Sequence, residues 1–486
     1  MIKSKVSAKG GSASGGKSQK SEVINQGAIL VSLLVFTSIF IILAGGLLSL
    51  VVYQYKLNKY KVAKAQAIHV AEAGINYYRW HLAHEPDDFQ DGTGGAGPYV
   101  HDFRDPQGNI IGQFSLIITP MPNTTIVSIQ STGWLLSYPN IKRIILAQYG
   151  IPALSAYAVV ANADMRFGSG TQTYGPIHSN GGIRFDGVAH NIVTSARQTY
   201  VDPDDSQTEF GVHTHTAPQD PQPPAAVPQR TDVFQAGRKF PVTTVDFNGF
   251  TTNLADLKTL AKNNGLYLDK SNKRGYWLHF NSNQTVDIYI VKTVTDTCGS
   301  TDTDGIAQTM NNPQLGEPLP ANGIIFIEDK VWVDGQINNS RLTLVAAREP
   351  LASGDADIII NHNLLYTNKN GSDVLGLIAQ RNITVGLYSD DNLEIDASLV
   401  AKSGRIGRYY FTSSCSSTYY ERNSIALYGS LATYNRYGFS WSCGETYCSG
   451  YQNRTITYDG HLTFSPPPSF PTSGEYTFIS WRELNP

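Results

Sequence analysis

The stretch AILVSLLVFTSIFIILAGGLLSLVV, residues 28–52, decides how the rest of the chain is arranged. It contains no charged residue and no proline, and Leu, Ile, Val and Phe make up most of it. A helix rises about 1.5 Å per residue, so the stretch is long enough to cross a hydrocarbon core of roughly 30 Å. A helix also pairs its backbone groups internally, as a lipid environment requires. The stretch therefore predicts a single membrane span.

Two other interpretations of this stretch stay open from the sequence alone. The apolar region of a cleaved secretory signal runs about 7–15 residues, which is shorter, although Ala44-Gly45-Gly46 could be cut. A buried core helix is the second, but basic and aromatic side chains flank the stretch, as they flank membrane spans. These flanking residues are Lys17, Lys20, Tyr53, Tyr55, Lys56, Lys59, Lys61 and Lys64. Lysines lie on both sides, so their number does not set the orientation.

The 486 residues leave room for two or three domains beyond this stretch. The formal net charge is −3 and no basic cluster occurs after residue 64, so we expect no nucleic-acid partner. From residue 100 onward Gly, Asn, Ser, Thr and Tyr are frequent. That composition favours short strands and many turns over helices.

The four cysteines, Cys298, Cys415, Cys443 and Cys448, all lie in the C-terminal half of the chain. They form no CxxC pair and have no histidine nearby at zinc spacing, so disulfides made in an oxidising compartment are expected. We expect all four to be oxidised, with Cys443 and Cys448 joined to each other or one of them joined to Cys415. This predicts a single-pass protein of the cytoplasmic membrane, with its N-terminus inside and everything after Tyr53 outside.

The segments on either side of the span differ in kind. Residues 1–27 are rich in Lys, Ser, Gly and Gln and cannot bury a core, so a disordered polar leader is expected there. Residues 56–84 contain no proline, so the helix that starts at residue 28 is expected to continue to residue 84, where Glu85-Pro86 ends it. Small and apolar residues share one face of this helix and would let another helix or a sheet approach closely. They are Ala63, Ala67, Val70, Ala71, Gly74, Tyr78 and Leu82.

Three features of the N-terminal region carry a resemblance: a polar leader that ends in Gly27, an apolar segment that starts AILV, and the pattern AxxxAEAG over residues 67–74. Residues 22–85 resemble the PilX-type minor pilins and other pilin-like proteins of type IV pilus and type II secretion systems. The resemblance implies that a prepilin peptidase cuts after Gly27 and leaves Ala28 as the new N-terminus. Major pilins usually carry Glu at the fifth mature position, where this chain has Ser32. That departure favours a minor, tip or non-assembling component.

Downstream of the helix the sequence predicts an α+β fold with two further regions before residue 322. Residues 99–150 contain alternating segments between 108 and 149, which predict an antiparallel, pilin-like headpiece. Residues 151–321 are expected to form a β-rich domain. It would contain a Pro-rich insertion at 201–241, read as an exposed loop, and a helix at 253–264 with Asn253 as its N-cap and Gly265 as its C-cap.

Residues 322–486 show apolar strands separated by polar corners rich in Asn and Gly. Such strand–turn–strand units predict a β-solenoid of stacked parallel rungs, with a two-sheet sandwich as the second choice. The proline run near residue 467 is expected to end the strands, so that the C-terminus lies across the solenoid as a cap. The side chains expected to point inward are Ile325, Ile327, Ile359, Ile378, Ile383, Ile395 and Leu427.

No catalytic motif stands out, and we predict no catalytic residue, no cofactor and no metal site. His178 precedes SNGG and is interpreted as a turn histidine. His213 and His215 could share one face of an extended chain and hold a metal, with a third ligand only guessable from residues 202–205. Two acidic turns lack the full set of calcium ligands and are interpreted as solvated turns. They are Asp302 with Asp304, and Asp390 with Asp391.

These observations together predict a membrane-anchored, pilin-like surface protein, a minor structural or adhesive component of a type IV pilus-like assembly, and not an enzyme. Expected partners are the membrane, other pilin-like subunits, a prepilin peptidase and surface glycans. Late aromatic residues would suit glycan contact, or packing against disulfide-tied loops. The alternatives are an anchored adhesin or glycan-binding β-helix protein unrelated to pili, and a β-helix enzyme that degrades polysaccharides. Fold alone does not decide among them.

Overall fold

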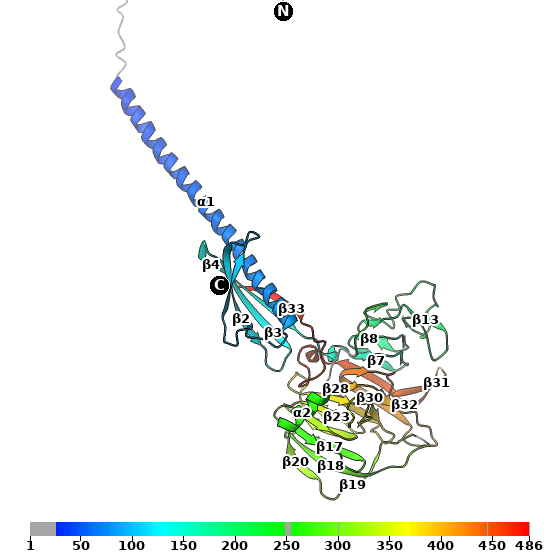
Figure 1. The fold of residues 1–486 in the computed structure, drawn as a ribbon. Helices are drawn as coiled ribbons and strands as arrows, with labels where there is room; N and C mark the ends of the chain where they lie inside the picture. The colour runs from blue at the N-terminus through cyan, green and yellow to red at the C-terminus, as the bar shows by residue number, and fades with distance from the viewer. Residues whose placement is uncertain (1–25, 248–253, 300, 445, 486) are drawn as a thin grey trace, which may run out of the picture.

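A computed structural model describes residues 26–247, 254–299, 301–444 and 446–485. Residues 1–25 of the predicted polar leader and the predicted N-cap Asn253 lie outside these ranges. The first element is the 59-residue helix α1 (Gln26–His84), which projects from the rest of the molecule (Figure 1). It is continuous across the apolar stretch and the segment that follows. A single uninterrupted helix is what the absence of proline predicts.

A five-stranded sheet packs against the C-terminal half of α1. Its strands pair antiparallel in the order β1 (Tyr99–Arg104), β2 (Ile110–Pro120), β3 (Ile126–Leu135), β4 (Tyr138–Gly150) and β33 (Thr477–Leu484). The antiparallel arrangement expected for residues 108–149 is thus present. Residues of β3 alternate between half-buried and buried along the whole strand, because one face of the sheet is turned to the helix. We call α1 from Ala63 onward, together with this sheet, the headpiece.

The predicted stripe of small residues is the face of α1 that meets the sheet. Ala63, Ala67 and Ala71 are buried in the headpiece core. A Cβ atom placed on Gly133 of β3 would lie 2.3 Å from the backbone nitrogen of Ala71 and 2.5 Å from the carbonyl oxygen of Ala67. Real Cβ atoms do not approach backbone that closely, so helix and strand are in direct backbone contact only because position 133 is glycine.

The proline run lies across the outer part of the protein, as the sequence predicts, but the segment after it returns to the headpiece. The carbonyl oxygens of Pro466 and Pro468 accept hydrogen bonds from Arg341 and Thr343, and Phe470 is buried against Ile378. β33 pairs with β4 along its length, with Trp481 opposite Ala147. Arg143 of β4 forms an ion pair with Glu483 of β33. The prolines at 466–468 do end the regular structure, and the chain resumes as a strand after them because the edge of β4 offers unpaired backbone groups. Residues 151–476 are therefore inserted between two neighbouring strands of one sheet.

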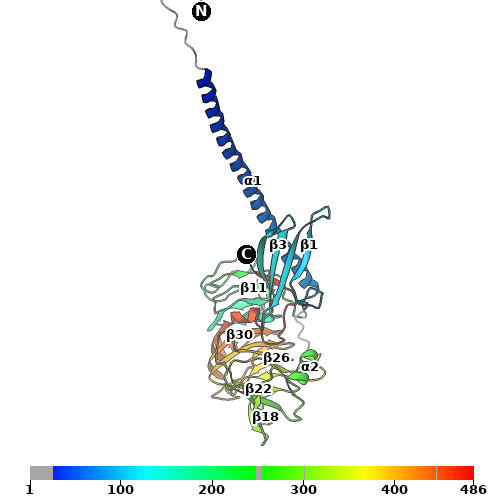
Figure 2. The ribbon, with the colours of Figure 1, turned by 90° about the vertical axis from the view of Figure 1, so that its left-hand side faces the viewer.

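The inserted region consists mainly of parallel strands stacked in register (Figure 2). One ladder runs β16 (Leu266–Leu268), β21 (Ile324–Ile327), β23 (Arg341–Ala346), β26 (Val374–Ala379), β28 (Asn392–Ala401), β30 (Glu421–Thr433), β5 (Val159–Ala161), β8 (Ile177–Ser179), β11 (Val193–Ser195) and β15 (Arg238–Lys239). A second runs β17 (Gly275–Asn281), β22 (Val331–Ile337), β24 (Ile358–Ile359), β27 (Ile383–Val385) and β29 (Ile406–Arg408). A third leads from β22 through β25 (Leu364–Tyr366), β28, β30, β32 (Thr446–Tyr458) and β7 (Thr171–Tyr174) to β10 (Val188–Ala189). We call this region the outer stack.

Shorter elements complete the outer stack. β6 (Met165–Phe167), β9 (Ile183–Phe185) and β14 (Val212–His213) form a small parallel sheet. The remaining strands pair antiparallel at its margins: β12 (Thr199–Val201) with β13 (Thr208–Phe210), β18 (Thr285–Val294) with β17, β19 (Ile306–Thr309) and β20 (Gln314–Pro318), and β31 (Ser440–Cys443) with β32. The helical pieces are α2 (Leu254–Asn264) and the short 3-10 turns η1 (Leu154–Ala156) and η2 (Gly460–Thr463).

The chain enters the outer stack in its middle. From β5 it runs to the end formed by β15, returns along the side through α2, and starts again at the opposite end with β16. The two halves meet where β30 pairs with β5 and β32 pairs with β7. The predicted boundary between domains at residues 321 and 322 is therefore wrong, since parallel pairing joins both segments into one stack. Sequence pattern is local and does not reveal such a long-range seam.

The strands of the first and second ladders are covered on both faces. Ile325, Ile327, Ile383, Ile395 and Leu427 lie in the interior core, as predicted. Ile378 and Ile359 are equally buried but face outward: Ile378 packs in the cluster that contains α2, and Ile359 packs with Val291 and Trp332. Strands buried on both faces are apolar without alternation, so the sequence does not tell the two faces apart.

Two disulfides tie the stack's loops. Cys298 is bonded to Cys415 and Cys443 to Cys448. Of the two arrangements expected for Cys443 and Cys448, the structure has the short loop.

Candidate functional site

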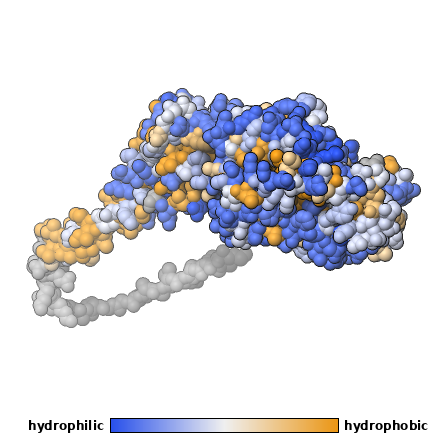
Figure 3. All heavy atoms as spheres, turned by 90° about the horizontal axis from the view of Figure 1, so that it is seen from below, coloured by the Kyte–Doolittle hydropathy of each residue, from blue (hydrophilic) through white to orange (hydrophobic). Residues whose placement is uncertain are grey.

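The N-terminal half of α1 is the most unusual surface of the protein. Its side chains from Ala28 to Val62 are almost all exposed, and the aromatic and aliphatic ones are large: Phe36 is 72% and Ile42 is 73% exposed. Figure 3 shows the hydrophobic residues gathered on this projecting part, while the outer stack is largely hydrophilic. By length and composition α1 can span a membrane. Exposed apolar surface of this extent marks a membrane or helix-packing surface.

The predicted processing residues lie at the start of α1. Because the helix begins at Gln26, the peptide bond between Gly27 and Ala28 is in its first turn. The hydroxyl of Ser32 donates a hydrogen bond to the carbonyl oxygen of Ala28 at 2.8 Å. This side chain is neutral and bonded within its own helix, so it provides no carboxylate for the amine of a neighbouring subunit.

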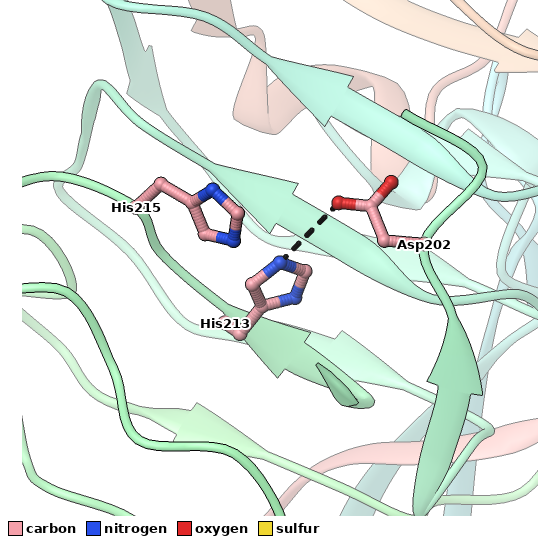
Figure 4. A group of neighbouring side chains, drawn as sticks. All are labelled: Asp202, His213 and His215. Atoms are coloured by element: carbon pink, nitrogen blue, oxygen red, sulfur yellow. Dashed lines mark ion pairs between the residues drawn. The ribbon is translucent and has the colours of Figure 1, made fainter. Parts of the chain in front are cut away.

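A cluster of histidine and acidic side chains lies at the end of the outer stack where β14 is the last strand (Figure 4). Asp202 follows β12, Glu209 is in β13, His213 is in β14 and His215 comes two residues later. The Nε2 atom of His213 is 3.5 Å from Oδ2 of Asp202. The Nε2 atom of His215 is 3.6 Å from Asp205 Oδ2 and 3.9 Å from Glu209 Oε1. We call these five residues the histidine cluster.

Three members of the histidine cluster are buried while His215 and Asp205 are partly exposed, and several of the cluster's polar atoms make no hydrogen bond within the described residues. His213 and Glu209 are 0% exposed and Asp202 is 1% exposed. Within the described residues, both ring nitrogens of His213, Nε2 of His215, Oδ2 of Asp202 and Oε2 of Glu209 have no hydrogen-bond partner. Buried polar groups are normally paired, so this concentration at one place is exceptional.

Charges around the histidine cluster are only partly balanced. Burial alone would raise the pKa of Asp202, but the neighbouring His213 ring and the Arg184 guanidinium outweigh it and lower that pKa. Arg184 Nη1 lies 4.0 Å from Asp202, whereas its Nε donates to Asp186 at 2.8 Å.

Sequence reasoning placed His213 and His215 on one face and looked for a third ligand among residues 202–205. The structure brings both histidines together with Asp202. The prediction that residues 201–241 form an exposed loop is wrong for part of that segment, because Phe210 to Thr214 and Val233 are buried. Glu209 was missed. Its signal is the turn DPDDSQ between two short β-rich runs, which predicts a hairpin that carries Glu209 back beside Asp202.

The other singled-out residues are structural in this arrangement. His178 is in strand β8 rather than a turn, is 2% exposed and bonds to Thr194 and Asn180, and burial lowers its pKa. Asp304 is buried and not in a solvated turn; Lys330 Nζ donates to it at 3.1 Å. Asp390 pairs with the exposed His362 at 2.9 Å.

An aromatic groove of about 400 Å³ lies beside β17, β22 and β24 of the second ladder. Trp277, Trp332 and Tyr388 line it, with Asp334 and His362 at its polar side. The indole of Trp277 donates to Asp334 at 2.8 Å and stacks on Tyr289, so its ring is held in place. Aromatic faces next to fixed polar groups suit the alternately apolar and hydroxylated faces of sugars.

Comparison with known proteins finds a slight structural likeness and no matching sequence. No family model matches the chain, and no curated protein sequence matches it. One solved structure that is similar is that of the competence-associated pilin ComZ from Thermus thermophilus, at 13% identity over 87% of this chain and 97% of ComZ, with a TM-score of 0.31. A likeness this slight supports no inference about fold or function.

Proposed function

We propose that this chain is a membrane-anchored, pilin-like surface protein, a minor component of a type IV pilus-like assembly. The observation that carries the proposal is the division of α1 into two halves. One half is apolar and exposed over its whole circumference, and the other is buried against a sheet through Ala63, Ala67 and Ala71. A helix that anchors a subunit in the membrane and continues into its folded part needs both properties.

The proposal assigns the Gly27–Ala28 bond to a prepilin peptidase and the exposed half of α1 to contacts with the membrane and with other pilin-like helices. Ser32 supports a minor role, because its hydroxyl cannot neutralise the terminal amine of a neighbour. The outer stack, which we read as a β-solenoid inserted in the headpiece, would be displayed outside the membrane. There the aromatic groove would serve adhesion to surface glycans. No catalytic role is proposed for any residue.

The processing step can be tested by N-terminal sequencing of the full chain extracted from membranes. The mature chain should begin at Ala28, and Gly27→Leu should retain the leader, because a prepilin peptidase requires a small residue there. Gly16→Leu, within the same leader, is the matched control and should be processed normally. A chain that begins at Met1, or beyond Ala44, would contradict the proposal.

Partner helices can be tested with a photo-crosslinking amino acid in place of Phe36, which is exposed on the anchor half of α1. Crosslinks to pilin-like subunits would support assembly. Crosslinks to lipid alone, in cells that make pili, would favour the alternative of an anchored adhesin unrelated to pili. The groove is tested separately by glycan binding of Trp277→Ala against Trp80→Ala, an exposed tryptophan of α1 that lies outside the groove.

A further inference from the structure

We propose that the histidine cluster is a zinc site, in which His213, His215 and Asp202 bind the ion and Glu209 completes a four-coordinate set. This site is independent of the pilin-like role proposed above. Its basis is the closeness of the ligand atoms of Asp202, His213 and His215 and the absence of hydrogen bonds to Oδ2 of Asp202 and Nε2 of both histidines within the described residues. Glu209 approaches this group through His215, and its Oε2 has no hydrogen-bond partner there.

The first argument is distance. A zinc ion holds nitrogen and oxygen ligands at about 2.0–2.2 Å, so two ligands of a tetrahedral site lie roughly 3.3–3.6 Å apart. His213 Nε2 and Asp202 Oδ2 are 3.5 Å apart, and His215 Nε2 and Glu209 Oε1 are 3.9 Å apart. The ligand atoms of Asp202, His213 and His215 all lie within 4.8 Å of one another. Small side-chain rotations would bring these atoms to the separations expected between the ligands of a tetrahedral zinc ion.

The second argument is the unmet bonding capacity. His213 is fully buried with neither ring nitrogen bonded, among the residues that the structure describes, and Oδ2 of Asp202 faces the same point. Leaving a buried polar group unpaired costs about 1–3 kcal/mol. A bound cation would satisfy several of these atoms at once. Figure 4 shows both imidazoles and the carboxylate around a common space, with the dashed line joining His213 to Asp202.

The third argument is ligand chemistry. Two imidazoles with carboxylates favour zinc or another late first-row divalent ion over calcium or magnesium, which prefer an all-oxygen set. Asp205 Oδ2 lies 3.6 Å from the same Nε2 atom of His215, on the more exposed side of the cluster. It would therefore compete with Glu209 as an oxygen ligand beside that nitrogen, and it is not an outer partner of the ring.

The position of the site indicates what zinc would do. β14 is the last strand of its small sheet, and the β12–β13 hairpin lies beside it. Zinc would join Asp202 and Glu209, at the two strands of the hairpin, to His213 and His215. An exposed strand edge is open to pairing with other chains. The ion would hold the hairpin over the end of the stack and so close that end.

The test uses the full chain in detergent, stripped with a chelator and titrated with ZnCl2 by calorimetry, with metal content measured by mass spectrometry. One zinc ion per chain is expected, and calcium should not compete. Asp202→Asn and His215→Gln keep side-chain volume and should weaken zinc binding roughly 100-fold or more, since loss of even an outer partner costs about 10–100-fold. His362→Ala, which removes an exposed histidine that pairs with Asp390, is the matched control and should bind zinc normally.

Hydrogen exchange supplies a readout that does not depend on affinity. At a free zinc concentration 100 times the dissociation constant, the opening of residues 199–215 should become about 100-fold rarer. The amides of β26, far along the stack, should not change. Zinc binding that survives both Asp202→Asn and His215→Gln, or no zinc binding by a folded wild-type chain, would overturn the proposal.

Discussion

Adding one methyl group to Gly133 tests whether the headpiece depends on direct contact between β3 and α1. In Gly133→Ala the new Cβ would lie 2.3 Å from the Ala71 nitrogen, 2.5 Å from the Ala67 oxygen and 2.9 Å from the Ala71 Cα. An ordinary contact needs about 3.5 Å, so helix and sheet must separate by roughly 1 Å. These neighbours are backbone atoms of a helix and cannot rotate away. A gap of that size forfeits a quarter to a half of each dispersion contact along the seam.

Overpacking of this kind typically costs about 1–3 kcal/mol, and the rigid neighbours place Gly133→Ala at the upper end, about 2–3 kcal/mol. Hydrogen exchange of the full chain, followed by mass spectrometry, should then show the amides of β3 opening roughly 30- to 150-fold more often. Gly95→Ala is the matched control, because its Cβ would have only the Thr93 hydroxyl at 3.9 Å. Equal exchange in the two variants would refute the claim that backbone contact holds α1 on the sheet.

Three further predictions concern the outer stack and the C-terminus. Ile359→Asp buries an unpaired charge beside Trp332 and should lower the free energy of unfolding, measured with denaturant, by about 4 kcal/mol or more. Ile359→Val should lower it by only about 1 kcal/mol, and similar unfolding midpoints for the two variants would contradict the burial of Ile359. Replacing Cys298 and Cys415 by Ser should destabilise by about 5 kcal/mol against about 2 kcal/mol for the Cys443 and Cys448 pair, because the loops span 117 and 5 residues; free thiols in the unreduced, denatured wild type would exclude both bonds. Deleting residues 475–486 should speed the hydrogen exchange of β4 amides and leave those of β26 protected, whereas deleting residues 485–486 alone should change neither. Faster exchange in the outer stack would contradict the assignment of this last segment to the headpiece.

Local sequence pattern was sufficient for the elements that depend on nearest neighbours. The length and composition of residues 28–84 predict one helix, and the spacing of Ala63, Ala67 and Ala71 predicts the face that meets a sheet. Alternation predicts the meander, and apolar runs with polar corners predict the stacked strands. Each of these follows from backbone geometry and periodicity within a few residues.

Pairings between distant segments could not be predicted in this way. TFISWREL reads equally well as a strand wherever it docks, and only the free edge of β4 determines that it joins the headpiece. The seam between β30 and β5 joins segments separated by most of the inserted region. The histidine cluster was half predicted: the alternate spacing of His213 and His215 is local, but Glu209 reaches them only through the fold of the β12–β13 hairpin.

The insertion of the outer stack between β4 and β33 has a consequence for biosynthesis. The ribosome makes β4 long before β33, and the edge of β4 stays unpaired while more than 300 residues follow. Strand edges in this state recruit other chains or are recognised as incomplete. A prematurely terminated chain would keep that edge open, however well its helix and meander had folded. The five-stranded sheet of the headpiece is therefore complete only after the last strand, β33, has been translated.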